Sequence, residues 1–113
     1  MEFIRNAWYV AGWSSEFVND LKSIKLLDEK IVIFRNSKGR VVALEDRCPH
    51  RFLPLSMGKL LGDKIECGYH GLTFNCEGSC VRIPSQKKIQ KTLKVLTFPI
   101  YEKHGIVWIW MGE

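Results

Sequence analysis

The sequence contains no long apolar run and few cysteines, and both absences narrow the possible classes of protein. No stretch approaches the roughly 20 consecutive apolar residues of a membrane-spanning helix. The first ten residues also lack the apolar segment of a secretory signal peptide. We therefore expect a cytoplasmic protein without a membrane partner. Only 4 of the 113 residues are cysteine, and in a reducing compartment such residues are more typical of metal ligands or buried thiols than of a disulfide framework.

A basic stripe is also missing. The 17 Lys and Arg residues exceed the 12 Asp and Glu residues, which gives a net charge of +5. They are dispersed along the chain and are not interleaved with aromatic residues, as they would be in a nucleic-acid-binding surface. The distribution argues against nucleic acid as a partner. A modest positive excess suits the steering of an acidic redox partner, because complementary charge raises encounter rates.

Sustained helical periodicity and internal repeats are absent as well, and short apolar runs take their place. The strand-like runs are Trp8–Trp13, Ile24–Leu27, Lys30–Arg35, Val41–Leu44, Leu72–Cys76, Val81–Pro84, Leu93–Pro99 and Ile106–Met111. Turn signals such as Asn36 to Gly39, Gly62-Asp63 and His104-Gly105 separate many of them. With 46% apolar residues, the pattern predicts one all-β domain over residues 1–113, with a helical turn or two within Ser14–Leu21.

Two segments interrupt the strand pattern in the same way. Cys48–Pro54 and Cys67–Gly71 each follow a strand-like run and are rich in Pro or Gly, so each is predicted to be a loop. Each loop carries one Cys and one His, in the patterns Cys48-x-His50 and Cys67-x-x-His70. Two Cys and two His are the ligands of a Rieske [2Fe-2S] cluster, in which the Cys pair holds one iron and the His pair holds the other.

Two other interpretations of these four residues remain open. Two Cys and two His also make a tetrahedral zinc set, although zinc sites more often pair Cys with Cys and His with His at short spacings. The four residues could also have no joint role, which requires two loops of matching composition to arise by accident. The cluster is favoured over both.

Longer motifs around the ligand candidates resemble a known family. The matching segments are Asn6–Ala11, Asp46–Phe52, Pro54–Ser56, Cys67–Phe74, Val81–Pro84 and Gly105–Trp110. Together they resemble the Rieske domain of ring-hydroxylating oxygenase large subunits, and their order is most similar to the vanillate O-demethylase and phthalate dioxygenase branch. The resemblance covers nearly the whole chain.

The resemblance implies a fold, a cofactor and partners. The fold would be a small antiparallel Rieske-type sandwich with two cluster-binding loops at one end. The chain would be the N-terminal electron-transfer module of an aromatic-ring oxygenase or O-demethylase, reduced by an NADH-dependent flavin/iron-sulfur reductase. The catalytic domain of that family holds a mononuclear iron through two His and a carboxylate. Beyond the two ligand candidates only His104 is left, which is too few for such a triad, so alone the chain is expected to oxidise nothing organic. The alternative is a free-standing Rieske ferredoxin that carries electrons between a reductase and an oxygenase.

The remaining reactive residues have simpler interpretations. Cys76 and Cys80 flank the turn signal Glu77-Gly78, so we expect them to lie opposite each other on paired strands as reduced thiols. His104 lies in a charged turn and is expected to be solvated. Trp108 and Trp110 alternate with apolar neighbours, which indicates packing within a strand.

Overall fold

Antiparallel strands make up nearly all of the regular structure. A computed structural model describes residues 3–18, 20–49, 53–68, 71–84 and 93–112, and within them it contains ten strands and two turns of 3₁₀ helix. The strands are β1 (Ala7–Trp13), β2 (Lys22–Leu26), β3 (Glu29–Arg35), β4 (Val41–Glu45), β5 (Lys59–Leu61), β6 (Lys64–Glu66), β7 (Thr73–Phe74), β8 (Cys80–Arg82), β9 (Ile100–Lys103) and β10 (Ile106–Met111). The 3₁₀ turns are η1 (Ser14–Glu16) and η2 (Leu55–Met57). The all-β prediction is confirmed, and no described helix is long and apolar enough to cross a membrane.

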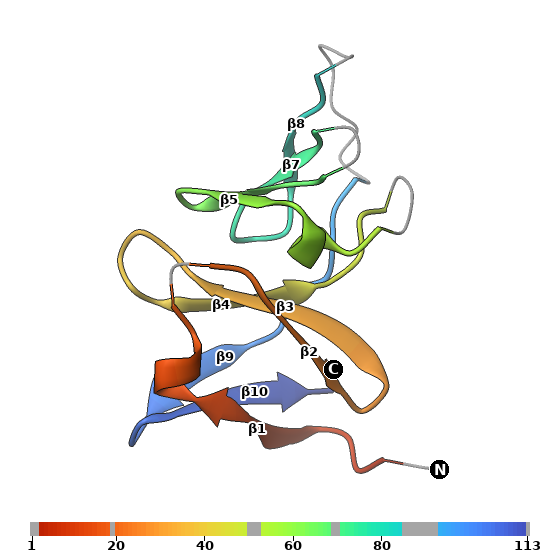
Figure 1. Ribbon diagram of the computed structural model, residues 1–113. Helices are drawn as coiled ribbons and strands as arrows, with labels where there is room; N and C mark the ends of the chain where they lie inside the picture. Colours follow the sequence, from red (N-terminus) through yellow and green to blue (C-terminus); the bar gives the residue numbers. More distant parts are fainter. Residues whose placement is uncertain (1–2, 19, 50–52, 69–70, 85–92, 113) are drawn as a thin grey trace.

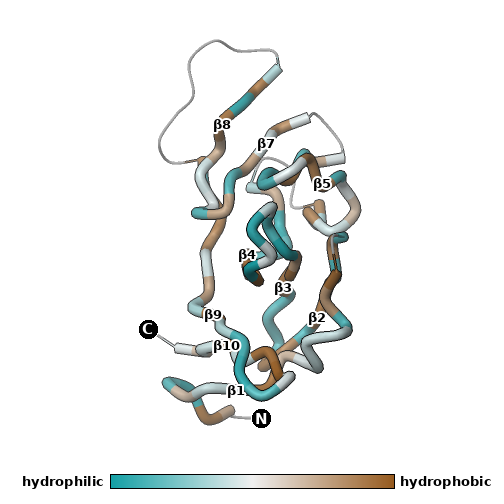
Figure 2. The backbone as a smooth tube through the Cα atoms, turned by 90° about the vertical axis from the view of Figure 1, so that its left-hand side faces the viewer, coloured by the Kyte–Doolittle hydropathy of each residue, from teal (hydrophilic) through white to brown (hydrophobic). Residues whose placement is uncertain are grey.

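The strands form three sheets stacked in layers. The strand orders are β1-β10-β9, β2-β3-β4 and β5-β6-β7-β8, and every pairing is antiparallel. In Figure 1 the sheet with β1 lies at the bottom, the sheet with β3 in the middle and the sheet with β5 at the top. Figure 2, turned by 90°, gives the same order. The predicted antiparallel sandwich is therefore present, with the β2-β3-β4 sheet as its shared central layer.

Strand β3 explains why the central sheet is covered on both faces. Its residues 31–34 are all apolar and all fully buried, which is the pattern of a strand packed on both sides. Because side chains alternate along a strand, Ile31 and Ile33 join one core with Val107 and Ile109 of β10. The intervening side chains of β3 join a second core toward the β5–β8 sheet, and that second core contains Cys48 and Cys67.

The segment predicted as one strand over Leu93–Pro99 is not a strand, and this prediction was wrong. It crosses all three layers: Lys94 bridges to Ser79 beside the top sheet, and Thr97 bridges to Leu44 of the central sheet. The chain then enters β9, the edge strand of the bottom sheet. An extended segment that passes from sheet to sheet cannot keep a continuous ladder with any one of them.

The outer face of the β1-β10-β9 sheet is aromatic. Trp8 packs edge-on against Tyr101 and Trp110, with ring centroids 4.8 and 5.6 Å apart. Val107 and Ile109 point to the opposite face and are fully buried. The predicted packing role of Trp110 within its strand is confirmed.

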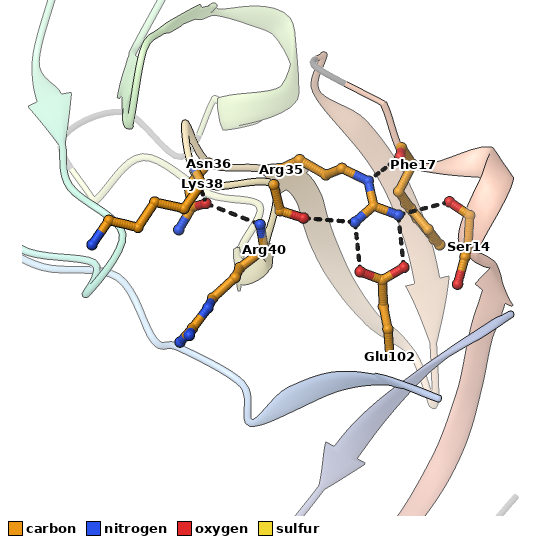
Figure 3. A network of polar contacts seen from close by, with 8 residues as sticks. Ser14, Phe17, Arg35, Asn36, Lys38, Arg40 and Glu102 are labelled. Atoms are coloured by element: carbon orange, nitrogen blue, oxygen red, sulfur yellow. Dashed lines mark hydrogen bonds and ion pairs between the residues drawn. The ribbon is translucent and has the colours of Figure 1, made fainter. Parts of the chain in front are cut away.

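Arg35, at the end of β3, connects the central and bottom layers (Figure 3). Its guanidinium donates to both carboxylate oxygens of Glu102 in β9, at 2.5 and 2.7 Å, and to the carbonyl oxygens of Ser14, Phe17 and Gly39. All five guanidinium N–H groups are thereby used. The hydrogen bonds between the two side chains are the main cause that lowers the pKa of Glu102 and raises the pKa of Arg35.

Replacing Glu102 tests this connection. We expect Glu102→Gln to lower the free energy of unfolding by about 1–2 kcal/mol at pH 7, because charge-assisted hydrogen bonds are lost. The lowered pKa means that the stabilisation is present above the ordinary value of 4.5 and is lost as the pH falls through the folded-state value. The difference between wild type and variant, measured by urea unfolding, should therefore narrow below about pH 4.5.

The matched control is Glu29→Gln, which removes the charge from the more exposed Arg5–Glu29 pair. It should change stability by less than about 0.5 kcal/mol. Equal losses in the two variants would contradict the special role of Arg35 and Glu102.

Candidate metal centre

The first candidate loop begins at Cys48, which follows β4 after Asp46 and Arg47. Cys48 is 1% exposed and lies in the core between the central and top sheets. Its N–H donates to the carbonyl oxygen of Leu53, five residues later, at 2.7 Å. Pro54 then leads into η2, whose first residue, Leu55, is fully buried. The loop is thus closed at its base by a backbone hydrogen bond and anchored on both sides in the core.

The second candidate loop joins β6 to β7 and has the same closure. Cys67 is 2% exposed, and its N–H donates to the carbonyl oxygen of Leu72, again five residues later and again at 2.7 Å. Gly71 donates its N–H to the carbonyl oxygen of Cys67 and has a φ of +72°. A residue with a Cβ is strained at that φ. The glycine therefore allows the chain to turn back into β7.

The flanks of the two loops meet backbone to backbone at Gly58 and Gly68. A Cβ on Gly58 would lie 2.0 Å from the carbonyl oxygen of Glu66, and one on Gly68 would lie 3.1 Å from the carbonyl oxygen of Met57. The segment after the first loop therefore packs against the start of the second. This approach fixes the positions of the two loop bases relative to each other.

The structure places two of the four predicted ligands in one buried core. Cys48 and Cys67 belong to the same buried core, each at the start of a loop with the same closure. His50 and His70 lie outside the described residues. Among the residues that are described, no three His, Cys, Asp or Glu side chains gather into a metal site. The four-residue ligand set therefore remains a prediction. The positions of its two cysteines, in one core and at the starts of similarly closed loops, agree with it.

The cysteines suit an iron–sulfur cluster. Thiolates are the ligands that Fe–S clusters require. A thiolate in an apolar core is costly unless a cation compensates its charge. Two thiols in one core, at the starts of two similarly closed loops, fit a group that takes one ligand pair from each loop. The residues present therefore fit a Rieske-type cluster.

Cys76 and Cys80 lie outside this arrangement. The prediction that they face each other on paired strands was wrong, because Cys80 pairs with Phe74 and Cys76 lies in the connecting turn. Cys76 donates from Sγ to the carbonyl oxygen of Asp63 at 3.2 Å. Both are thiols rather than a disulfide, as predicted. Burial is the main cause that raises the pKa of each thiol, so both stay protonated at neutral pH.

His104 is placed as predicted. It is exposed in the turn between β9 and β10, with a φ of 58°. It lies in the bottom layer, whereas the core with Cys48 and Cys67 lies between the central and top layers.

The contacts that support the loops have no local signal in the sequence. Asp46 is 4% exposed and accepts two hydrogen bonds from Ser56, from its N–H and from its hydroxyl, both at 2.7 Å. Asp46 and Ser56 lie in segments that resemble the family, but nothing in the pattern of residues ten positions apart indicates that they pair. The close approach of Gly58 to Glu66 likewise depends on the tertiary arrangement.

Comparison with known proteins assigns the class. Residues 7–99 match the Rieske [2Fe-2S] domain family, so the chain belongs to that family and its cofactor is a Rieske-type [2Fe-2S] cluster. The predicted resemblance to oxygenase components is confirmed by named relatives. The chain is 47% identical over 112 residues to the iron-sulfur subunit of a toluene-4-sulfonate monooxygenase system from Comamonas testosteroni, covering 98% of this chain and 32% of that protein. It is 40% identical to a vanillate O-demethylase oxygenase subunit from a Pseudomonas species, covering 98% and 31%.

Solved structures agree with the sequence relatives. Dicamba monooxygenase bound to dicamba matches with a TM-score of 0.95 and 40% identity, over 100% of this chain and 34% of that one. The oxygenase–ferredoxin complex of carbazole 1,9a-dioxygenase matches with a TM-score of 0.88 and 32% identity, over 96% and 29%. The chain therefore spans about a third of the length of the relatives it matches. It corresponds to their Rieske domain.

The approach of the two loops can be tested at Gly58. Gly58→Ala should cost about 3 kcal/mol of unfolding free energy and reduce cluster content, because the new methyl group meets a backbone carbonyl that cannot move aside easily. The measurement is denaturant unfolding together with iron analysis of the purified protein.

Gly62→Ala is the matched control. Gly62 has open space around its Cβ position and a φ of +62°, so its substitution should cost only the 1–2 kcal/mol, roughly, of left-handed backbone strain and leave the iron content unchanged. A Gly58→Ala variant with the iron content and stability of Gly62→Ala would show that the two loop flanks are not held in close contact.

Proposed function

We propose that this chain is the electron-entry module of a Rieske non-haem iron oxygenase, with its cluster held by Cys48, His50, Cys67 and His70. The observation that carries the proposal is the equivalence of the two loops. Each starts with a buried Cys in one common core and closes with an N–H to carbonyl bond across five residues. In the sequence, each loop then supplies one His within three residues of its Cys.

The residues of this chain have separate roles in that proposal. Cys48 and Cys67 would bind one iron from inside the core, where water is excluded. His50 and His70 would bind the other iron, farther along each loop. When bound, a Rieske cluster accepts and releases one electron at a time. The backbone closures at Leu53 and Leu72 hold the loop bases in place, and a rigid site limits the reorganisation that accompanies a change of charge.

The proposed electron donor is an NADH-dependent flavin/iron-sulfur reductase, and the proposed acceptor is a catalytic mononuclear-iron domain. The relatives support a module over a free-standing ferredoxin, because this chain matches about a third of proteins named as oxygenase components. One matched structure is a complex between an oxygenase and a ferredoxin, which supports a protein electron donor. The net charge of +5 favours an acidic partner surface.

The ligand set is tested by substitution. Purified wild type should contain two irons and two acid-labile sulfides per chain, the composition of a [2Fe-2S] cluster. Cys48→Ser and Cys67→Ser should each abolish cluster assembly, because a hydroxyl is a poor ligand for this iron. The measurements are iron and sulfide analysis and the visible absorption spectrum.

Cys76→Ser is the control, since Cys76 is a half-buried thiol in a turn. It should keep the wild-type iron and sulfide content. A wild-type protein that contains zinc and no sulfide, or a Cys76→Ser variant as depleted as Cys48→Ser, would overturn the ligand assignment.

A separate experiment tests whether this chain transfers electrons without oxidising a substrate itself. With NADH, a flavin reductase and oxygen, the chain should be reduced but should hydroxylate or demethylate no aromatic compound. If the positive excess guides docking, the reduction rate should fall as ionic strength rises past about 0.1 M, where the Debye length is roughly 10 Å. Product formation by this chain alone would contradict the module, whereas a salt-independent rate would contradict only the charge steering.

A further inference from the structure

A buried carboxylate lies at the base of the first loop. Asp46 is 4% exposed and stands between the end of β4 and Cys48. Ser56, in η2, donates its N–H to Oδ1 and its hydroxyl to Oδ2, both at 2.7 Å. Asp46 also donates its own N–H to the carbonyl oxygen of Lys30 in β3, at 3.0 Å. Ser56, after the loop, thus binds both carboxylate oxygens of Asp46, before the loop. The backbone of Asp46 is in turn bound to the central sheet.

The pair encloses the whole loop. Residues 46 and 56 lie outside the Cys48–Leu53 hydrogen bond, so the loop has two nested closures, one through backbone atoms and one through side chains. The closure extends to the second loop, because Ser56 is followed by Met57 and Gly58, which pack against Gly68 and Glu66. A displacement of Ser56 would therefore disturb both loops.

The carboxylate depends on Ser56. A buried charge is costly unless hydrogen bonds satisfy it, and within the described part of the chain Asp46 takes part in no ion pair. In that part of the chain, the carboxylate oxygens of Asp46 accept hydrogen bonds from the N–H and the hydroxyl of Ser56. Removing the serine hydroxyl leaves one buried carboxylate oxygen without its donor, which costs more than the loss of an exposed hydrogen bond.

We propose that Asp46 and Ser56 are a positioning pair that holds the base of the first loop, and with it Cys48, in the position in which the thiolate binds the cluster. In this role the pair binds no iron itself and acts through the loop. This inference rests on the ligand set of the proposed function.

The same chain offers a matched control pair. Ser37 donates its N–H to Oδ1 of Asp63 at 2.5 Å and its hydroxyl to Oδ2 at 2.9 Å. The donors and acceptors are the same as in the first pair, but Ser37 and Asp63 are exposed and join the β3–β4 turn to the β5–β6 turn. Ser37→Ala therefore removes the same hydroxyl contact away from both loops.

The experiment compares the cluster-loaded wild type with Ser56→Ala, Ser37→Ala and Ser56→Thr. The rate of cluster loss is followed by visible absorption in the presence of an iron chelator. Ser56→Ala should lose the cluster on the order of ten-fold faster than wild type, because a buried charged hydrogen bond is removed. Ser37→Ala should stay within about two-fold of wild type. Ser56→Thr, which retains both donors, should restore most of the difference.

A second readout separates positioning from general stability. The g-values in the electron paramagnetic resonance spectrum of the reduced protein report on the ligands of the cluster, and a uniform loss of fold stability does not move them. They should shift in Ser56→Ala and remain unchanged in Ser37→Ala. If Ser56→Ala does not fold, Asp46→Asn is measured in its place, and an unchanged spectrum and loss rate in that variant would overturn the proposal.

Failure of the positioning pair and failure of the proposed function give different results. Equal loss rates and spectra for Ser56→Ala and Ser37→Ala would overturn the positioning pair and leave the ligand set standing. A wild-type protein without iron would overturn the proposed function, and the positioning pair with it.

Discussion

The candidate centre depends on two backbone hydrogen bonds, from Cys48 N–H to Leu53 oxygen and from Cys67 N–H to Leu72 oxygen. Each closes a loop that begins at a buried cysteine, and so holds the backbone of that cysteine in place beside the core. The bonds lie in or beside an apolar core, where a hydrogen bond is stronger than in water and an unmade one is more costly. The same local geometry, used twice, places two thiols in one core from two separate parts of the sequence.

The layers of the fold explain how those two loops meet. Strand β3 is buried on both faces, so it supports one core toward β10 and another toward the β5–β8 sheet. The second core receives both cysteines. The close approach of Gly58 to the carbonyl of Glu66 then brings the exit of the first loop against the entry of the second. A stacked arrangement of small sheets is thus sufficient to place the bases of the two loops, without long elements of secondary structure.

The sequence predicted the parts of the fold that follow from local pattern. The residues of β3 and β10 are strongly apolar or alternate with period two, and His104-Gly105 supplies the positive φ values that a two-residue hairpin needs. The strands β5 and β6 were not predicted, because three residues each are too few to show a period. Leu93–Pro99 was predicted as a strand because its composition is strand-like, yet composition carries no information about which layer each residue meets.

The candidate site was likewise predictable from the sequence only in part. The cysteine and histidine spacing identified the ligand candidates, since ligand type and local spacing are written in the sequence. The tertiary contacts that hold the loops were not predicted. Asp46 and Ser56 are ten residues apart, and Gly58 meets Glu66 only because β5 pairs with β6. The opposite-strand placement of Cys76 and Cys80 failed because the turn between β7 and β8 includes Cys76 itself.

Pulsed electron paramagnetic resonance on the dithionite-reduced protein, labelled with ¹⁵N-histidine, tests the proposed ligand set. We expect couplings to two histidine nitrogens that bind the cluster, from His50 and His70, and the same two couplings in a His104→Gln variant. A reduced cluster with no histidine coupling, or one whose couplings disappear when His104 is replaced, would show that His50 and His70 are not the ligands.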